Sequence, residues 1–119
     1  MKKTLVLGAS TNPERYSFLA ANKLVSHGHE IELLGKKKEE LLGKTIKTSP
    51  QEIKDIDTVT LYLNPKNQES YYDYILGLKP KRIIFNPGTE NPELEKLAES
   101  KGIETIEACT LVMLSTGQY

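Results

Sequence analysis

The sequence has one cysteine, no excess charge of either sign and no long apolar run. Because Cys109 is the single cysteine, no disulfide can form within the chain, and a lone thiol is typical of a reducing compartment. Sixteen basic residues balance sixteen acidic ones, so the total charge does not indicate a nucleic acid or a membrane surface as a partner. No apolar run approaches the roughly 20 residues of a membrane-spanning helix. We therefore expect a cytoplasmic protein with no nucleic acid and no membrane partner.

The residues that are present are those of one small folded domain. Hydrophobic residues make up 38% of the chain and charged residues 27%, a balance that argues against a disordered protein. A length of 119 residues is enough for one domain with a modest core. No internal repeat and no low-complexity linker divides the chain, so we expect residues 1–119 to form a single domain.

Apolar runs alternate with helical patterns along the chain. Strands are predicted at residues 3–8, 30–34, 58–63, 82–86 and 103–107, and helices at 13–27, 50–55, 65–77, 91–101 and 110–115. Strands that alternate with helices favour right-handed crossovers and a mainly parallel sheet. The predicted fold class is therefore α/β, a Rossmann-like three-layer sandwich with a five-stranded parallel sheet.

Four of the predicted helices have a marked start, in which an asparagine or a serine precedes a proline. The pairs are Asn12-Pro13, Ser49-Pro50, Asn64-Pro65 and Asn91-Pro92. The asparagine or serine side chain accepts a hydrogen bond from a free amide of the first turn. Proline at the first helical position loses no bond, because an N–H there has no partner in the helix. These pairs therefore predict where the helices begin.

The composition of the strands predicts their order in the sheet. Residues 5–7 and 83–85 are continuously apolar, as expected of strands that are covered on both faces. Residues 58–63 alternate between polar and apolar, and residues 103–107 are more polar, so both are predicted to be edge strands. With the strands numbered one to five, this pattern predicts the order 3-2-1-4-5. The ligand crevice is then expected between the carboxyl ends of strands one and four.

The first predicted strand leads directly into a polar turn and a helix. Free amides and the dipole at a helix start make a seat for an anion, and Gly8 allows a phosphate to approach the backbone. We therefore predict a phosphate-bearing ligand here, with Arg15 within reach of the phosphate. The predicted contacts are Gly8, Ala9, Ser10, Thr11, Asn12, Pro13 and Arg15. An ordinary strand-to-helix connection that is capped by Asn12 is the alternative.

The turn departs from the dinucleotide fingerprint Gly-x-Gly-x-x-Gly, because Ser10 and Pro13 stand where that fingerprint requires glycine. The fingerprint also expects an acidic residue at the end of the second strand. This chain instead has Gly35 and Lys36 there, followed by two more lysines. A lysine at this point suits a ribose that carries a phosphate, while a solvated lysine run is the alternative.

Two more turns follow strands at the same edge of the predicted sheet. The turn after residues 58–63 is predicted to form one wall of an adenine pocket, and the turn after residues 82–86 to face Gly8 across the crevice. Their predicted ligand contacts are Leu63, Asn64, Pro65, Asn86, Pro87 and Gly88. For both turns, a simple helix start is the alternative.

No catalytic or metal-binding set is predicted. His27 and His29 lie between the first helix and the second strand, at the end of the sheet opposite the expected crevice. Two histidines without a third ligand do not indicate a metal site. Cys109, near the start of the last helix, is expected to be a small buried residue rather than a nucleophile.

Several segments together resemble a known family. Residues 8–15 (GASTNPER) resemble the Gly-x-Ser-x-x-Pro turn of small stand-alone coenzyme A-binding proteins, which are similar to the CoA-binding domain of the succinyl-CoA synthetase alpha subunit. Residues 42–44, 86–91 and 107–114 resemble other segments of one branch of that family. The resemblance covers nearly the whole chain.

The resemblance implies a Rossmann-like domain that binds coenzyme A through its ADP part. The residues that match the family's diphosphate contacts by position are Gly8, Ser10, Asn12 and Pro13, with Gly88 opposite. Many relatives carry Asn-Pro after the second strand, where this chain has residues 34–36 (LGK). Our hypothesis is that a lysine replaces that contact and binds the 3′-phosphate.

The leading functional interpretation is non-catalytic binding of coenzyme A, or of an acyl-CoA, through the ADP moiety at the carboxyl ends of the strands. Two alternatives stay open, an NAD(P)-binding reductase-like domain and a protein-interaction module with a vestigial nucleotide crevice. Polar edge strands do not favour extension of the sheet. Association into a homodimer or with a larger partner also stays open.

Overall fold

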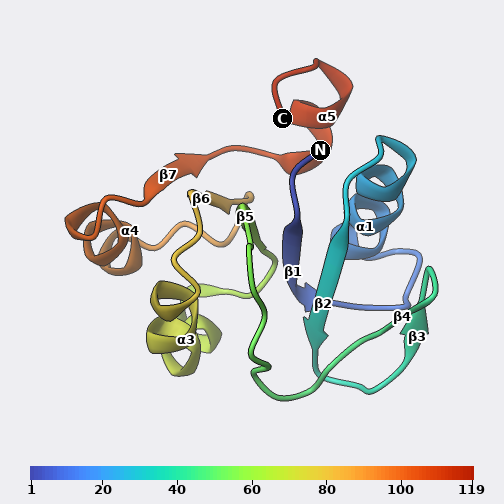
Figure 1. The fold of residues 1–119 in the computed structure, drawn as a ribbon, viewed down its shortest axis with the longest axis horizontal. Helices are drawn as coiled ribbons and strands as arrows, with labels where there is room; N and C mark the ends of the chain where they lie inside the picture. Colours follow the sequence, from blue (N-terminus) through green and yellow to red (C-terminus); the bar gives the residue numbers. More distant parts are fainter.

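Five parallel strands form the centre of the structure, a computed structural model that describes residues 1–119. Along the chain, the elements are β1 (Thr4–Ala9), α1 (Tyr16–Ser26), β2 (Ile31–Gly35), β3 (Glu40–Leu41), β4 (Lys44–Thr45), β5 (Thr58–Leu61), α2 (Pro65–Gln68), the 3₁₀ helix η1 (Glu69–Tyr71), α3 (Tyr72–Gly77), β6 (Arg82–Phe85), α4 (Pro92–Ser100), β7 (Glu104–Glu107) and α5 (Thr110–Ser115). Helices α1 and α5 cover one face of the sheet, and α3 and α4 lie on the other (Figure 1). The predicted α/β class and parallel sheet are therefore confirmed.

The core is built on both faces of the sheet because successive residues of a strand point to opposite sides. In β1, Leu5 and Leu7 pack with the side chains of α3 and α4, whereas Val6 packs with those of α1 and α5. All three side chains are buried, as the continuous apolar run predicts. No helix combines the length and the apolar composition needed to cross a bilayer.

The order of the strands corrects the prediction. It is β2-β1-β5-β6-β7, so the strand predicted at residues 58–63 lies between β1 and β6 and not at an edge. Its polar residues are buried because their hydroxyl groups have partners. The Oγ1 atoms of Thr60 and Thr110 lie 2.8 Å apart, and Arg82 Nε donates to Thr58 Oγ1 at 2.8 Å. The prediction that residues 103–107 form an edge strand is confirmed.

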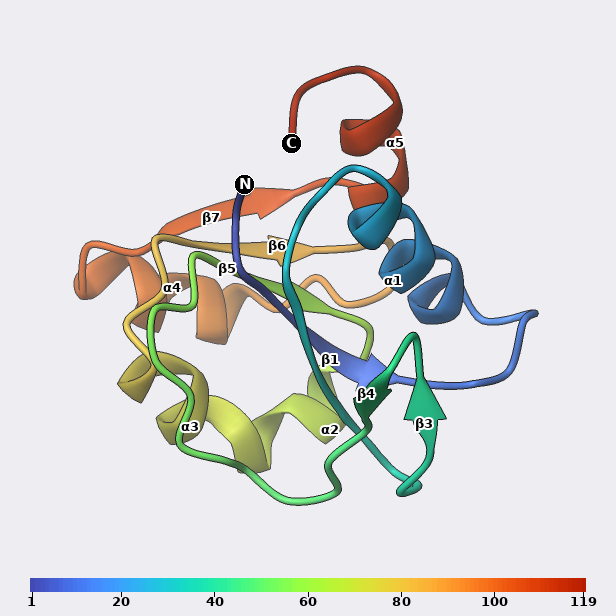
Figure 2. The same ribbon diagram turned by 45° about the vertical axis from the view of Figure 1, so that its right-hand side comes forward.

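A rudimentary strand occupies the outer position beside β2. Lys47 N–H donates to Leu33 O at 3.0 Å and Gly35 N–H donates to Lys47 O at 2.8 Å, which makes a single parallel bridge. The chain reaches this bridge through the hairpin β3–β4, which Figure 2 shows near the end of the sheet where β1 and β2 terminate. Because the sheet then continues on the other side of β1, the switch point of the fold lies between β1 and β5.

Two of the four predicted helix starts are confirmed. Asn64 Oδ1 accepts from Asn67 N–H at 2.9 Å, and Asn91 Oδ1 accepts from Leu94 N–H at 3.2 Å. The first helix instead begins at Tyr16, because Asn12 Oδ1 accepts from Glu14 N–H at 3.0 Å and shapes the turn that precedes the helix.

The remaining helix predictions are mixed. Residues 50–55 form no helix, because the Ser49 side chain is bonded to the Gln51 side chain and not to a first-turn amide. The single helix predicted at residues 65–77 is divided into α2, η1 and α3. The short helix predicted at 110–115 is present with those bounds.

Candidate functional site

A cleft lies at the carboxyl ends of β1 and β5 and has a volume of about 590 Å³. Its walls come from the turn after β1, the first turn of α1, the segment after β2 and the turn after β5. The lining residues are Gly8, Ala9, Ser10, Thr11, Asn12, Glu14, Arg15, Tyr16, Ser17, Lys36, Lys37, Glu39, Tyr62, Leu63, Asn64 and Asn67. The cleft therefore sits at the switch point of the sheet, where ligands bind in folds of this class.

Gly8 sets the distance between the first turn and the end of β5. Its φ is +102°, and a Cβ atom there would lie 3.0 Å from both the carbonyl carbon and the carbonyl oxygen of Tyr62. Only glycine combines this backbone conformation with so close a neighbour. Tyr62 N–H also donates to Leu7 O at 2.8 Å, so β5 is fastened to β1 directly below the cleft.

The turn after β1 presents unpaired backbone amides to the cleft. Ser10 Oγ accepts from Asn12 N–H at 3.0 Å, which folds the turn back on itself. Among the lining residues between 10 and 17, those whose backbone N–H groups make no hydrogen bond within the chain are Ser10, Thr11, Tyr16 and Ser17. Free amides at a turn and at a helix start form a site for an anion.

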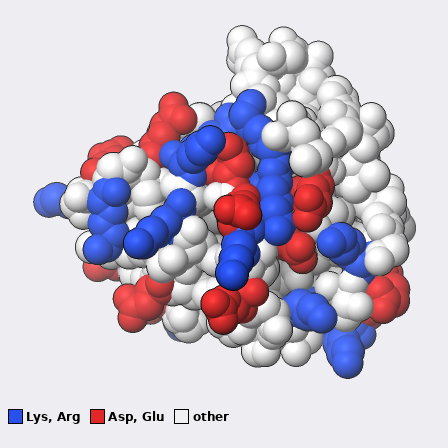
Figure 3. Space-filling model, in the orientation of Figure 1, with Lys and Arg blue, Asp and Glu red and all other residues white.

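The charged groups at the cleft are mainly basic. Arg15, Lys36 and Lys37 line it, together with the carboxylates of Glu14 and Glu39. On the face of the molecule seen in Figure 3, basic and acidic side chains are interspersed and form no large field of one sign. Any selectivity for an anion in the cleft must therefore arise locally.

Gly35 brings the end of β2 against the end of β1. A Cβ atom at Gly35 would lie 2.3 Å from the carbonyl oxygen of Ala9, so no other residue fits without a shift of the backbone. Lys36 directly follows Gly35 in the chain. The close approach of the end of β2 to the end of β1 therefore places Lys36 at the cleft, which it lines. Lys36 also borders a second, smaller cavity of about 200 Å³.

The smaller cavity adjoins the cleft and is more apolar. Its lining residues are Leu7, Gly8, Leu34, Gly35, Lys36, Leu63, Asn67, Ser70 and Tyr71. Gly8, Lys36, Leu63 and Asn67 border both spaces. The two spaces therefore adjoin each other, and together we call them the recess, whose walls extend from the first turn of α1 to η1.

The structure brings together most of the site residues that the sequence predicts. Those that line the large cleft are Gly8, Ala9, Ser10, Thr11, Asn12, Arg15, Lys36, Leu63 and Asn64, and Gly35 lines the smaller cavity. Pro13 and Pro65 are neighbours of lining residues and do not line either space. Whether the lining residues contact a ligand stays a prediction.

The turn after β6 does not face Gly8. Asn86, Pro87 and Gly88 line neither cavity, because β5 separates the end of β6 from the end of β1. The Asn86 side chain is buried, and its Nδ2 donates to Thr60 Oγ1 at 2.7 Å and to Leu61 O at 2.9 Å. Its Oδ1 accepts from Thr110 N–H at 2.8 Å. This side chain therefore fastens β5, β6 and α5 to one another.

Seven lining residues of the cleft are not among the predicted ligand contacts, namely Glu14, Tyr16, Ser17, Lys37, Glu39, Tyr62 and Asn67. Tyr16 and Leu19 are apolar residues three positions apart in α1, but both side chains are exposed. The buried side chains of α1 are instead Ser17, Ala20, Ala21 and Leu24. Ser17 follows the helical spacing of these buried residues. That spacing is the sequence signal that could have placed Ser17 in the wall of the cleft.

One tyrosine of the cleft, Tyr62, has a partly buried side chain. Burial raises the pKa of Tyr62 to about 12, and its hydroxyl has no hydrogen-bond partner.

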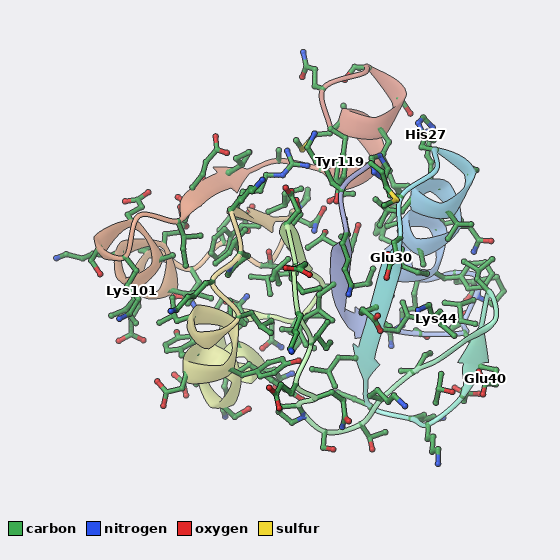
Figure 4. The ribbon with its side chains drawn as sticks, viewed as in Figure 1. His27, Glu30, Glu40, Lys44, Lys101 and Tyr119 are labelled. Carbon is green, nitrogen blue, oxygen red and sulfur yellow. The ribbon has the colours of Figure 1, made fainter.

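His27 lies with Tyr119 at the end of the molecule opposite the hairpin residues Glu40 and Lys44 (Figure 4). His29 is close to the same end, since its ring centroid lies 4.8 Å from that of Tyr119. Neither histidine lines the cleft.

Residues 2–115 match the model of the CoA binding domain family. The chain belongs to this family. No curated protein matches the chain.

Solved structures support the fold of this family member. An uncharacterised protein with a crystal structure is 60% identical, with a TM-score of 0.98 over 100% of this chain and 98% of the other. A hypothetical protein from Pyrococcus horikoshii OT3 is 30% identical, with a TM-score of 0.85 over 97% of this chain and 82% of the other. The Thermus thermophilus protein cell-free ID.343 is 23% identical, with a TM-score of 0.84 over 99% and 90%, and shows the fold alone.

Proposed function

We propose that this CoA-binding-family protein binds coenzyme A, or an acyl-CoA, with the ADP moiety in the recess at the carboxyl ends of β1, β2 and β5. The observation that carries the proposal is the set of unpaired amides after β1, at Ser10, Thr11, Tyr16 and Ser17. A diphosphate offers several anionic oxygens, and such oxygens are the preferred partners of free amides at a helix start.

The adenosine end of the ligand fits the smaller cavity in this proposal. Leu34 and Leu63 supply apolar surface for a base, and Asn67 and Ser70 supply polar groups at its border. Lys36 borders both this cavity and the cleft with the diphosphate seat, and Lys37 borders the cleft. We propose that one of them binds the 3′-phosphate, which distinguishes coenzyme A from NAD and from dephospho-CoA.

We further propose that this domain binds its ligand without transforming it. The cleft contains two carboxylates, Glu14 and Glu39, whose residues are exposed to solvent. Both histidines belong to the opposite end of the sheet. No pair of nucleophile and base therefore converges on the cleft.

A ligand panel tests the function. The melting temperature is measured with coenzyme A, dephospho-CoA, ADP, NADH and NADPH, and Kd by isothermal titration calorimetry. Stabilisation follows mass action and reaches roughly 2.7 kcal/mol at a ligand concentration of 100 times Kd. We expect coenzyme A to bind best and dephospho-CoA clearly more weakly. Stabilisation by NADH or NADPH without stabilisation by coenzyme A would overturn the proposal.

A charge variant tests the lysines, and a distant lysine provides its control. Lys36→Met with Lys37→Met is expected to weaken coenzyme A about tenfold, because hydrogen bonds to charged groups contribute roughly 1.5–3 kcal/mol. The loss should be much smaller for dephospho-CoA. Lys101→Met removes a charge at the far end of α4 (Figure 4) and should leave both affinities unchanged. Equal losses for the two ligands would refute the 3′-phosphate contact.

A further inference from the structure

Ser17 is a buried residue whose hydroxyl has no partner within the chain. The residue is 3% exposed, it lines the cleft, and its Oγ makes no hydrogen bond within the chain. Hydroxyl groups of buried residues are normally bonded within the protein. Ser17 Oγ is instead open to the cleft and is available to bond a group that enters it.

The other buried serine and threonine residues of the chain make the contrast clear. They are Thr4, Thr58, Thr60, Thr89 and Thr110, and each forms at least one hydrogen bond through its Oγ1. Ser17 is the exception among six. The buried oxygens that are sealed from solvent without a partner belong to Tyr62 and Glu95, and Ser17 Oγ is not one of these. The small exposed surface of Ser17 therefore faces the cleft that it lines.

The backbone around Ser17 is also unpaired. The N–H groups of Tyr16 and Ser17 begin the 11-residue helix α1 and make no hydrogen bond within the chain. The residue at the N-cap, Arg15, gives no side-chain hydrogen bond to this helix end. The first turn of α1 contains no acidic residue, so nothing within that turn repels an anion.

Ser17 differs from Ser10, which the sequence singles out. Ser10 Oγ already accepts a hydrogen bond from Asn12 N–H at 3.0 Å, so it serves first to fold the turn. Ser17 has both its hydroxyl and its backbone N–H available as donors. Two donors on one residue at a helix start are suited to an oxygen that carries negative charge.

We infer that Ser17 is a ligand-binding residue, which donates from Oγ and from its backbone N–H to a phosphate oxygen at the start of α1. This inner phosphate subsite lies beyond the Ser10–Asn12 turn, in the first turn of α1. The inference rests on the proposed function, because the ADP moiety supplies the phosphate. It makes Ser17, rather than Ser10, the serine whose hydroxyl contributes most to affinity.

The test is Ser17→Ala in the full chain, measured with coenzyme A, ADP and inorganic pyrophosphate. Alanine suits a helix and leaves no buried hydroxyl, so the ligand-free protein should be at least as stable as wild type. The Kd for all three ligands should rise about tenfold, which corresponds to about 1.4 kcal/mol. Ser26→Ala is the matched control, since Ser26 Oγ bonds to Lys23 O at the other end of the same helix. It should leave every Kd unchanged.

The outcomes separate this inference from the proposed function. Wild-type affinity retained by Ser17→Ala for ADP and pyrophosphate would overturn the inference and leave coenzyme A binding intact. A loss of stability with unchanged affinity would also overturn it, because Ser17 would then have a structural role. If wild type binds ADP and pyrophosphate but not coenzyme A, the proposed function fails, and the ratio of ADP affinities still decides the role of Ser17. If wild type binds none of the three, both fail.

Discussion

Gly35→Ala is the substitution whose effect the structure predicts most directly. A Cβ atom at Gly35 would lie 2.3 Å from the carbonyl oxygen of Ala9 and 3.0 Å from a methyl group of Ile46. The first neighbour is backbone in the central strand β1, so a side-chain rotation cannot relieve the contact. The end of β2 must therefore move away from β1 by about 1 Å to restore an ordinary contact distance.

The cost of this movement is that of overpacking a well-ordered core, about 1–3 kcal/mol. In a domain of this size, each kcal/mol corresponds to a change of roughly 4 °C in the melting temperature, so we expect a decrease of about 4–12 °C. The displacement also carries Lys36 away from its place between the two cavities. Coenzyme A affinity should therefore fall in addition, with a smaller loss for dephospho-CoA.

Urea unfolding followed by circular dichroism measures the stability, and two other glycines provide controls. Gly77 ends α3 with nothing within 4 Å of its Cβ position, so alanine there should stabilise the protein by about 0.5 kcal/mol. Gly43 also has open space but a φ of +76°, so alanine should cost about 1 kcal/mol through its backbone alone. A Gly35→Ala protein as stable as Gly77→Ala would refute the steric argument.

Three further predictions concern polar side chains that do not line the cleft. Gln68 Nε2 donates to Leu63 O and Thr89 O at 2.8 Å each. Gln68→Glu should therefore lower the free energy of unfolding by about 3 kcal/mol or more at neutral pH, with partial recovery in acid, when the carboxyl group can donate. Urea midpoints that do not depend on pH would contradict this prediction. Asn86→Ala breaks three hydrogen bonds and should cost about 2–4 kcal/mol, checked by the same unfolding assay against the exposed Gln118→Ala. Burial lowers the pKa of His29, whose Nδ1 accepts from Lys2 N–H at 2.9 Å. The contribution of neutral His29 to stability is therefore present above the unfolded pKa of about 6.5 and is lost as the pH falls below that value. His29→Gln should flatten the dependence of the urea midpoint on pH between pH 7.5 and 5.5.

The sequence predicts the local structure of this chain well where one residue type has one physical use. Asn64 and Asn91 cap their helices as the asparagine-proline pattern indicates. The same pattern fails at Ser49, because the segment that follows crosses from the bridge at Lys47 to β5 as an extended connection. A capping pattern indicates that a helix can begin at a residue. It does not indicate that the segment after that residue is free to form a helix.

The strand order was not predictable from alternation alone. Polar residues at every second position mark an edge strand only when they face water. In β5, Thr58 and Thr60 instead face Arg82, Asn86 and Thr110, and these partners lie 24 to 50 residues further along the chain. Single-strand composition cannot show these partners. The isolated bridge between Leu34 and Lys47 also could not be predicted, because a single pair of backbone hydrogen bonds leaves no pattern in the sequence.

The position of β5 also changes the reason for glycine at the first turn. From the sequence, Gly8 is expected to make room for a phosphate. In the structure, the atoms nearest to its Cβ position are the carbonyl carbon and oxygen of Tyr62, both at 3.0 Å. Gly8 is therefore required by the fold before any ligand arrives, and its presence alone does not indicate binding. The groups that do point to a ligand are those the fold leaves without partners, the amides after β1 and the hydroxyl of Ser17.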